Sequence, residues 1–240
     1  MENKKSLLNA TSVEIIPNLS LKIPTVGEIL EDEDSYYNIV SSLTASPFQF
    51  MVQLDDMGID YTQITDYQLF MMLFPMYTKS DLSLLFGDLD TSDFGIYINQ
   101  QDNSQVIYSP SNNIVIDELV YNDLADTIRK INLFEKVKSK PGNESARKYL
   151  LEKERKKQKR NAKKPKEPYL EKLVIALVNT SEFPYNYETC MDLSIYKFNQ
   201  SFKQIQQKIT FDNTMIGVYA GTVDTSKMTN KDALSWISSK

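Results

Sequence analysis

The chain has 240 residues, of which 41% are hydrophobic and 25% are charged, and it holds only 7 glycines and 9 prolines. This composition excludes a disordered chain and favours helices over a loop-rich β-sandwich. The formal net charge is −5, and the chain has one cysteine and no histidine. An intramolecular disulfide, the usual catalytic triads and most zinc sites are therefore excluded.

Two extended segments are predicted first along the chain, after a flexible arm over residues 1–12. Residues 13–16 and 19–23 partly alternate apolar and polar side chains. Pro17 separates the two segments and Pro24 follows them. Because proline is tolerated at sheet edges, the pattern predicts two short edge strands.

Helical signals follow as far as residue 87. Residues 25–28 and 65–68 each place a threonine three residues before a glutamate or glutamine, which is the spacing of a capping box. Residues 81–86 are predicted to form a further short helix that ends at Gly87. The first third of the chain is therefore expected to hold several short helices.

A small sheet is predicted next. Residues 94–99 and 105–108 alternate apolar and polar side chains and are separated by a polar turn. They are expected to form a β-hairpin, with residues 114–116 as a third strand. Asp117 is placed to cap the helix that follows.

Longer helices are predicted in the second half. One apolar stripe runs from residue 120 to residue 131, and residues 169–178 form a buried helix. A narrow seam then repeats at spacings of three and four residues, which is typical of a coiled coil or of a helix in a bundle. Its short length favours the bundle. The seam residues are Ile195, Phe198, Phe202, Ile205 and Ile209.

The elements together predict a predominantly helical α+β protein. Residues 1–137 are expected to form an α+β N-terminal domain with a small β-hairpin. Residues 138–168 are expected to form a charged basic helix that links it to the next domain. Residues 169–240 are expected to form a helical C-terminal domain with a polar tail.

The linking segment holds the strongest local charge signal. Between residues 153 and 166 there are nine basic residues and one acid, Glu154, so the rest of the chain is strongly acidic. A solvated helix, a docking site for an acidic protein and a phosphate-binding site are the alternatives. The overall acidity and the lack of interleaved aromatic residues disfavour nucleic acid. The basic residues are Lys153, Arg155, Lys156, Lys157, Lys159, Arg160, Lys163, Lys164 and Lys166.

Two apolar segments are candidates for partner contacts. The first follows residue 69 and is rich in methionine, which adapts to varied partners, although a place in an ordinary core is the alternative. The second is a short hydrophobic group near the C-terminus. For partner binding the sequence nominates exposed side chains at Phe70, Met71, Met72, Phe74, Met76 and Trp236.

No motif points to catalysis. The chain has neither a phosphate-binding glycine loop nor a dinucleotide-binding glycine pattern. Asp88, Asp90 and Asp93 loosely follow a calcium loop but lack its glycine and its final glutamate. We therefore expect no enzyme activity, no metal and no cofactor. Cys190 is expected to be a small buried hydrophobic residue.

Membrane and targeting signals are also missing from the sequence. No apolar run approaches the roughly 18 residues of a membrane-spanning helix, and the N-terminal apolar stretch is too short for a signal peptide. We therefore expect no membrane association, and the cytosol is the expected compartment.

Several stretches together resemble a known group of proteins. They are IPTVGEIL at residues 23–30 with SYY at 35–37, DDMGIDY at 55–61 with DYQLF at 66–70, and MDLSIYKF at 191–198 with GVYAG at 217–221. The combination resembles structural and assembly proteins encoded in the tail modules of phages and prophages of Gram-positive bacteria. Within these modules it is most similar to a tail assembly chaperone.

The resemblance implies a role and its partners. A tail assembly chaperone acts in the host cytoplasm, where it binds the long helical tape-measure protein and keeps it soluble until the tail tube forms. Such a role implies binding to other tail proteins, is compatible with self-association and requires no cofactor. Two alternatives stay open. One is a structural virion component of the baseplate, neck or tail-completion type, and the other is a nucleic-acid-binding protein that uses residues 153–166.

Overall fold

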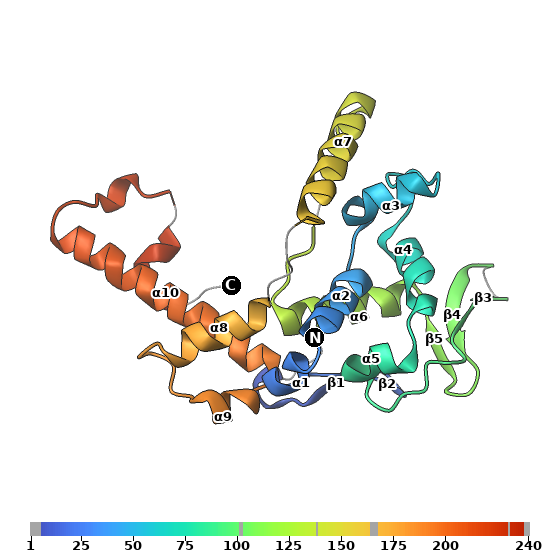
Figure 1. Cartoon of the computed structure of the whole chain (residues 1–240), viewed down its shortest axis with the longest axis horizontal. Helices are drawn as coiled ribbons and strands as arrows, with labels where there is room; N and C mark the ends of the chain where they lie inside the picture. Colours follow the sequence, from blue (N-terminus) through green and yellow to red (C-terminus); the bar gives the residue numbers. More distant parts are fainter. Residues whose placement is uncertain (1–5, 101–102, 138, 164–167, 230, 238–240) are drawn as a thin grey trace.

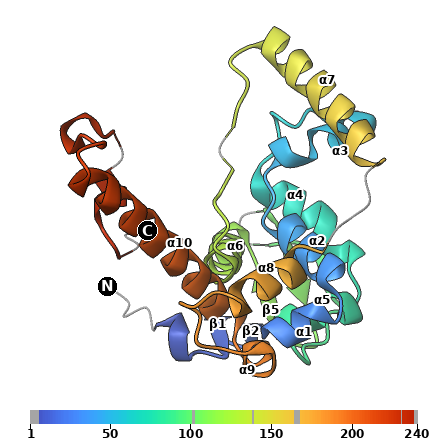
Figure 2. The ribbon, with the colours of Figure 1, turned by 60° about the vertical axis from the view of Figure 1, so that its left-hand side comes forward.

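The computed structural model describes residues 6–100, 103–137, 139–163, 168–229 and 231–237. Helices predominate in it, with two small antiparallel sheets, which confirms the predicted α+β class. Most helices and both sheets gather into one body (Figure 1). Helix α7 lies at one side of this body beside α3, and the far end of α10 extends away from it (Figures 1 and 2).

The described elements follow the chain in this order. The first third contains η1 Leu7–Asn9, β1 Ser12–Ile16, β2 Leu19–Lys22, α1 Val26–Leu30, α2 Glu33–Leu43, η2 Pro47–Phe50, α3 Met51–Asp56, α4 Asp66–Leu73, η3 Phe74–Met76 and α5 Lys79–Phe86. The middle contains β3 Gly95–Ile98, β4 Gln105–Ser109, β5 Ile114–Ile116, α6 Glu118–Asn132 and α7 Glu144–Asn161. The last third contains α8 Tyr169–Val178, α9 Tyr187–Met191, α10 Ile195–Tyr219, η4 Thr225–Lys227 and η5 Lys231–Leu234.

Local sequence signals determine where the helices begin and end. Both predicted capping boxes form, and in the first the Glu28 amide donates to Thr25 Oγ1 at 3.2 Å while the Thr25 amide donates to Glu28 Oε2 at 2.9 Å. Asp117 caps α6 by accepting from the Val120 amide. Gly87 ends α5 with a φ of +61°, a conformation that favours glycine. These predictions are confirmed.

Both sheets match the predicted strands. β1 and β2 form an antiparallel pair, and β3, β4 and β5 form a three-stranded meander in that order. In the meander Ile107, Ile114 and Ile116 are fully buried, whereas Ile96 and Ile98 on β3 are exposed. One face of the sheet therefore packs on the core, and β3 is its exposed edge.

The main core joins segments from most of the chain. It includes Leu21 of β2, Tyr36 of α2, Ile128 of α6, Leu170 of α8 and Phe198 of α10. Two backbone hydrogen bonds join the start of α1 to the start of α10 beside this core. The Val26 amide donates to the Leu193 carbonyl, and the Ile195 amide donates to the Pro24 carbonyl, each at 2.8 Å. The predicted division into two domains stays a prediction, although α8 and the first half of α10 share their core with the N-terminal elements.

A second, smaller apolar cluster lies under α7. Its buried members are Ala45, Met51, Val52, Leu54, Tyr61 and Leu69. Leu150 and Leu151 of α7 pack against this cluster from outside and are only partly buried. The charged helix is therefore attached to the body through the α3–α4 region. None of the helices in the described part of the chain is both long enough and apolar enough to cross a membrane.

Candidate interaction surfaces on α7 and α10

Helix α7 is held at its start and along one side. The Asn143 side chain caps it by accepting from the Ala146 amide at 2.8 Å. No residue of α7 is fully buried. Its attachment to α3 therefore depends on partial apolar contacts and on ion pairs.

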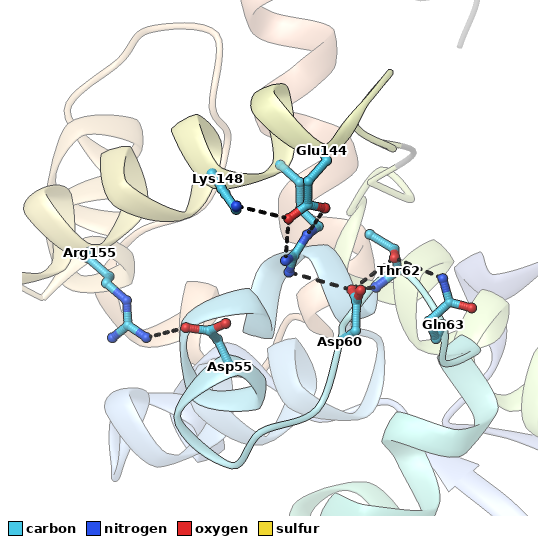
Figure 3. Close-up of polar contacts among 8 residues, drawn as sticks. Asp55, Asp60, Thr62, Gln63, Glu144, Lys148 and Arg155 are labelled. Atoms are coloured by element: carbon cyan, nitrogen blue, oxygen red, sulfur yellow. Dashed lines mark hydrogen bonds and ion pairs between the residues drawn. The ribbon is translucent and has the colours of Figure 1, made fainter.

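The ion pairs join arginines of α7 to acids that precede α4 (Figure 3). Arg155 Nη2 lies 2.6 Å from Asp55 Oδ2 and 2.6 Å from Asp56 Oδ1. Arg147 Nη1 lies 3.7 Å from Asp60 Oδ1, and its Nε lies 2.8 Å from Glu144 Oε2. We call the contacts of Arg155 and Arg147 with Asp55, Asp56 and Asp60 the α7 clasp.

Hydrogen bonds and nearby charges raise the pKa of an arginine in the clasp and lower the pKa of a carboxyl group in it. The hydrogen bonds that Arg155 donates to Asp56 and Asp55 raise the pKa of its guanidinium. Hydrogen bonds from the backbone and side chain of Thr62 lower the pKa of Asp60, with a smaller contribution from Arg147. All of these groups are partly exposed. Exposed ion pairs contribute little to stability and are screened by salt, so the clasp holds α7 weakly.

An open groove of about 620 Å³ lies between α7 and the η2–α3 segment. Its apolar side chains are Phe48, Met51, Tyr149 and Leu150. Its basic side chains are Lys153, Lys156, Lys157 and Arg160 of the predicted basic segment. We call this feature the α7 groove.

The remaining basic residues of the segment have other positions. Arg155 belongs to the clasp, and Lys159 and Lys163 are exposed and do not line the groove. Lys164 and Lys166 lie outside the described residues. The sequence therefore marked a basic region as a whole. In the structure, one of its residues belongs to the α7 clasp and four line the α7 groove.

The methionine-rich segment requires a correction. Phe70, Met71 and Phe74 are buried in the main core, with exposed fractions of 1%, 6% and 2%, so the expected exposure of these three side chains is wrong. The Phe70 and Phe74 rings pack against each other at a tilt of 37°, with centroids 5.0 Å apart. Only Met72 and Met76 are exposed. A partner-binding role for these two stays a prediction.

Trp236 is exposed, and its segment folds back along α10. Gln204 Nε2 of α10 donates to the Trp236 carbonyl at 2.6 Å, and Gln207 Nε2 donates to the Asp232 carbonyl at 2.7 Å. The Trp236 side chain is 58% exposed, and Ile237 beside it is also exposed. A contact role for Trp236 stays a prediction.

The predicted seam of α10 changes its surroundings halfway along the helix. Its first members, Ile195 and Phe198, are fully buried, and Ile205 is 9% exposed. After Ile205 no residue of α10 is buried. The helix therefore leaves the core while its apolar pattern continues.

The continuation keeps the same spacing. Successive steps of three, four and three residues from Ile209 reach Asp212, Ile216 and Tyr219. The three apolar side chains are 43%, 67% and 83% exposed. Asp212 accepts a hydrogen bond from Lys208 Nζ at 2.8 Å. We call these four positions the outer seam.

Sequence reasoning missed two of these features. The predicted seam stopped at Ile209, although the spacing itself extends through Asp212 to Ile216 and Tyr219. The apolar spacing is present in the sequence, but one acidic residue, Asp212, interrupts it. The clasp had no local signal, because Arg155 and Asp55 are 100 residues apart.

Two further features bear on metal binding and on the single cysteine. Within them no group of three or more Cys, Asp or Glu side chains is placed to hold a metal ion. Cys190 is fully buried, as expected, and burial raises the pKa of its thiol. A thiol with a raised pKa is a poorer source of thiolate.

The model of one family, described as the YomV second domain, matches residues 157–239, roughly a third of the chain. The match begins in the last turns of α7 and includes all of α10. YomV is a protein of phages and prophages of Gram-positive bacteria, so the match supports the phage association that the sequence resemblance implies. No curated protein and no solved structure matches the chain.

Proposed function

We propose that the protein is a phage tail assembly chaperone that binds the helical tape-measure protein through the outer seam of α10. The observation that carries the proposal is the exposed apolar continuation of a helix seam whose first half is core. This surface lies within the residues that match the YomV second domain. The resemblance to tail-module proteins suggests the partner.

The outer seam fits a helical partner. Ile209, Ile216 and Tyr219 lie on one face, at the spacing with which helices pack in coiled coils. Full burial of a large apolar side chain contributes roughly 1.5–3 kcal/mol, so covering this face gives a useful binding energy. Asp212 interrupts the seam with a polar group. Single polar groups at such positions select register and partner, so the partner helix is expected to bring a basic or amide side chain opposite Asp212.

In this proposal the protein works by binding and needs neither catalysis nor a cofactor. It acts in the cytoplasm of the host while tails assemble. Self-association remains compatible with the same seam, since a second copy of α10 offers the same spacing. In a parallel, in-register pair the two Asp212 carboxylates approach each other, which disfavours that arrangement.

The first experiment separates a chaperone from a structural subunit. Quantitative mass spectrometry compares purified phage particles with the lysate that produced them. A chaperone is expected to be abundant in the lysate and absent from particles. A fixed copy number per particle contradicts the chaperone role and supports a structural virion component.

A second experiment tests the binding surface. Double substitution Ile209→Ser with Ile216→Ser is expected to reduce co-purification of the tape-measure protein at least about tenfold, since two buried contacts exceed 1.4 kcal/mol. The matched control is Ile98→Ser on β3, because Ile98 is 65% exposed and Ile216 is 67% exposed. Circular dichroism checks that the folds agree. Equal binding by both variants contradicts the proposed surface.

A further inference from the structure

The α7 groove presents a basic stripe beside apolar side chains. Three basic residues, Lys156, Lys157 and Arg160, lie three, four and seven residues after Lys153. The four side chains therefore share one face of the helix. Tyr149, one turn before Lys153, is 65% exposed and lines the same groove. Phe48 and Met51 contribute from η2 and α3. The groove therefore combines an apolar floor with a basic rim.

Part of the charge on this rim is already neutralised by neighbours on α7. Lys156 Nζ lies 3.7 Å from Glu152, and Lys157 Nζ lies 3.3 Å from Glu154. No acid among the described residues lies within ion-pair distance of Lys153 or Arg160. These two groups are exposed and two turns apart on the same face. Among the described residues, therefore, no acid neutralises the positive charge that these two groups add to the rim.

We propose that the α7 groove docks an acidic amphipathic segment of a second protein. Carboxylates of such a segment meet Lys153 and Arg160, and its apolar side chains cover Phe48 and Tyr149. The proposal concerns a different helix from the outer seam, and it stands or falls independently of the tape-measure proposal.

The surroundings favour a protein over a nucleic acid. Glu152 and Glu154 also line the groove, and Asp55 and Asp56 lie on α3 beside α7. These acids repel a continuous phosphate backbone, whereas a short acidic segment needs positive charge at only a few points. The chain carries a formal net charge of −5, which adds to the repulsion of a polyanion.

The test measures binding of a defined peptide to the full chain by fluorescence anisotropy at low salt. The probe is a labelled helical peptide of about 18 residues, long enough to form a helix, with leucines on one face and glutamates on the other. Substitution of Lys153→Glu with Arg160→Glu is expected to weaken its binding at least about tenfold, as befits two lost charge contacts. Tyr149→Ser is expected to weaken it about threefold through lost apolar contact.

A matched pair near the end of α7 serves as control, with Lys159 on the helix and Lys163 just after it. Lys159→Glu with Lys163→Glu makes the same change in charge, but neither residue lines the groove. Less than about twofold weakening is expected for this pair, because screening limits charge effects from outside the groove. An analogous peptide with lysines in place of glutamates is expected not to bind.

Four outcomes overturn the proposal. The acidic peptide fails to bind, or both charge-reversal pairs weaken it equally. Alternatively, a single-stranded DNA oligonucleotide of similar length binds more tightly than the peptide, which assigns the stripe to nucleic acid. Finally, light scattering after size exclusion shows self-association of the unmodified chain that Lys153→Glu with Arg160→Glu abolishes, which makes the groove an interface between copies.

Discussion

At the scale of single residues, the main core contains one buried polar pair with a clear energetic role. Tyr36 is 1% exposed, and its hydroxyl donates to Asn132 Oδ1 at 2.9 Å. Burial raises the pKa of Tyr36, so the phenol remains a donor at all ordinary pH values. Asn132 Nδ2 in turn donates to the Ile128 carbonyl at 3.0 Å. The pair thus links α2 to α6 inside the core.

Tyr36→Phe is expected to lower the free energy of unfolding by about 1–3 kcal/mol, because it leaves the buried Asn132 oxygen without its donor. Urea denaturation followed by circular dichroism measures the change. Tyr61→Phe is the control, because the buried Tyr61 hydroxyl has no hydrogen-bond partner among the described residues. That variant is expected to lie within about 0.5 kcal/mol of the unmodified chain. Equal losses in both variants contradict the role of the hydrogen bond.

At the scale of elements, helix α8 begins with a cap supplied from far away in the sequence. Pro168 precedes the helix and offers no side-chain cap. Instead Glu33 Oε1 of α2 accepts from the Tyr169 and Leu170 amides, each at 2.7 Å. A carboxylate at a helix N-terminus satisfies free amides and interacts favourably with the helix dipole.

Glu33→Ala is therefore expected to lower the free energy of unfolding by about 0.5–2 kcal/mol, the usual cost of losing a helix cap. Glu31→Ala is a matched control, since Glu31 belongs to the same acidic run and is exposed, and although it stands at the C-cap position of α1, its side chain caps no helix N-terminus among the described residues. It is expected to change stability by less than about 0.5 kcal/mol. If urea denaturation gives similar values for the two variants, Glu33 does not act as the cap.

The end of α10 depends on a glycine. The Gly217 carbonyl accepts from the Thr222 and Val223 amides at 2.9 and 3.1 Å, which folds the C-terminal segment back. A Cβ added at Gly217 would lie 2.6 Å from Val223 Cγ2. Real atoms do not approach so closely, so Gly217→Ala forces the Val223 side chain or the turn that carries it to shift, even though alanine favours helix by about 1 kcal/mol.

Hydrogen exchange of the Thr222 and Val223 amides is expected to become faster in Gly217→Ala, because both hydrogen bonds to the Gly217 carbonyl lengthen. Adding Val223→Ala removes the clashing methyl groups and is expected to restore much of the protection, a coupling that independent sites do not show. Unchanged exchange in the single variant would mean that the turn absorbs the added methyl group without moving.

At the scale of the whole molecule, features marked by a pattern within one short stretch of sequence could be predicted. Features that join residues from distant stretches could not. The capping boxes, the hairpin and the first half of the α10 seam have local patterns. The Glu33 cap and the Arg155 contacts of the α7 clasp join residues more than 90 positions apart, so no local pattern marks them. The apolar run at residues 69–74 has no polar residue to show which side faces the core. Its exposed side chains could not be selected from periodicity.

The shared main core gives the last prediction. Leu170 and Phe198 are fully buried, and they pack into a cluster that includes Ile29, Tyr36 and Ile128 of the N-terminal elements. A fragment of residues 169–240 loses these partners, the Glu33 cap and the two backbone hydrogen bonds to Val26 and Pro24. A chain of about 70 residues without most of its core has too little buried surface to fold alone.

The isolated fragment is therefore expected to show no cooperative thermal transition by circular dichroism, whereas the full chain shows one. Mixing it with a fragment of residues 1–168 is expected to restore the transition, because the two pieces together contain the complete core. A cooperative transition in residues 169–240 alone would instead establish an independent C-terminal domain. The outer seam and the α7 groove would then belong to separately folding units, and a partner bound at one would not affect the stability of the other.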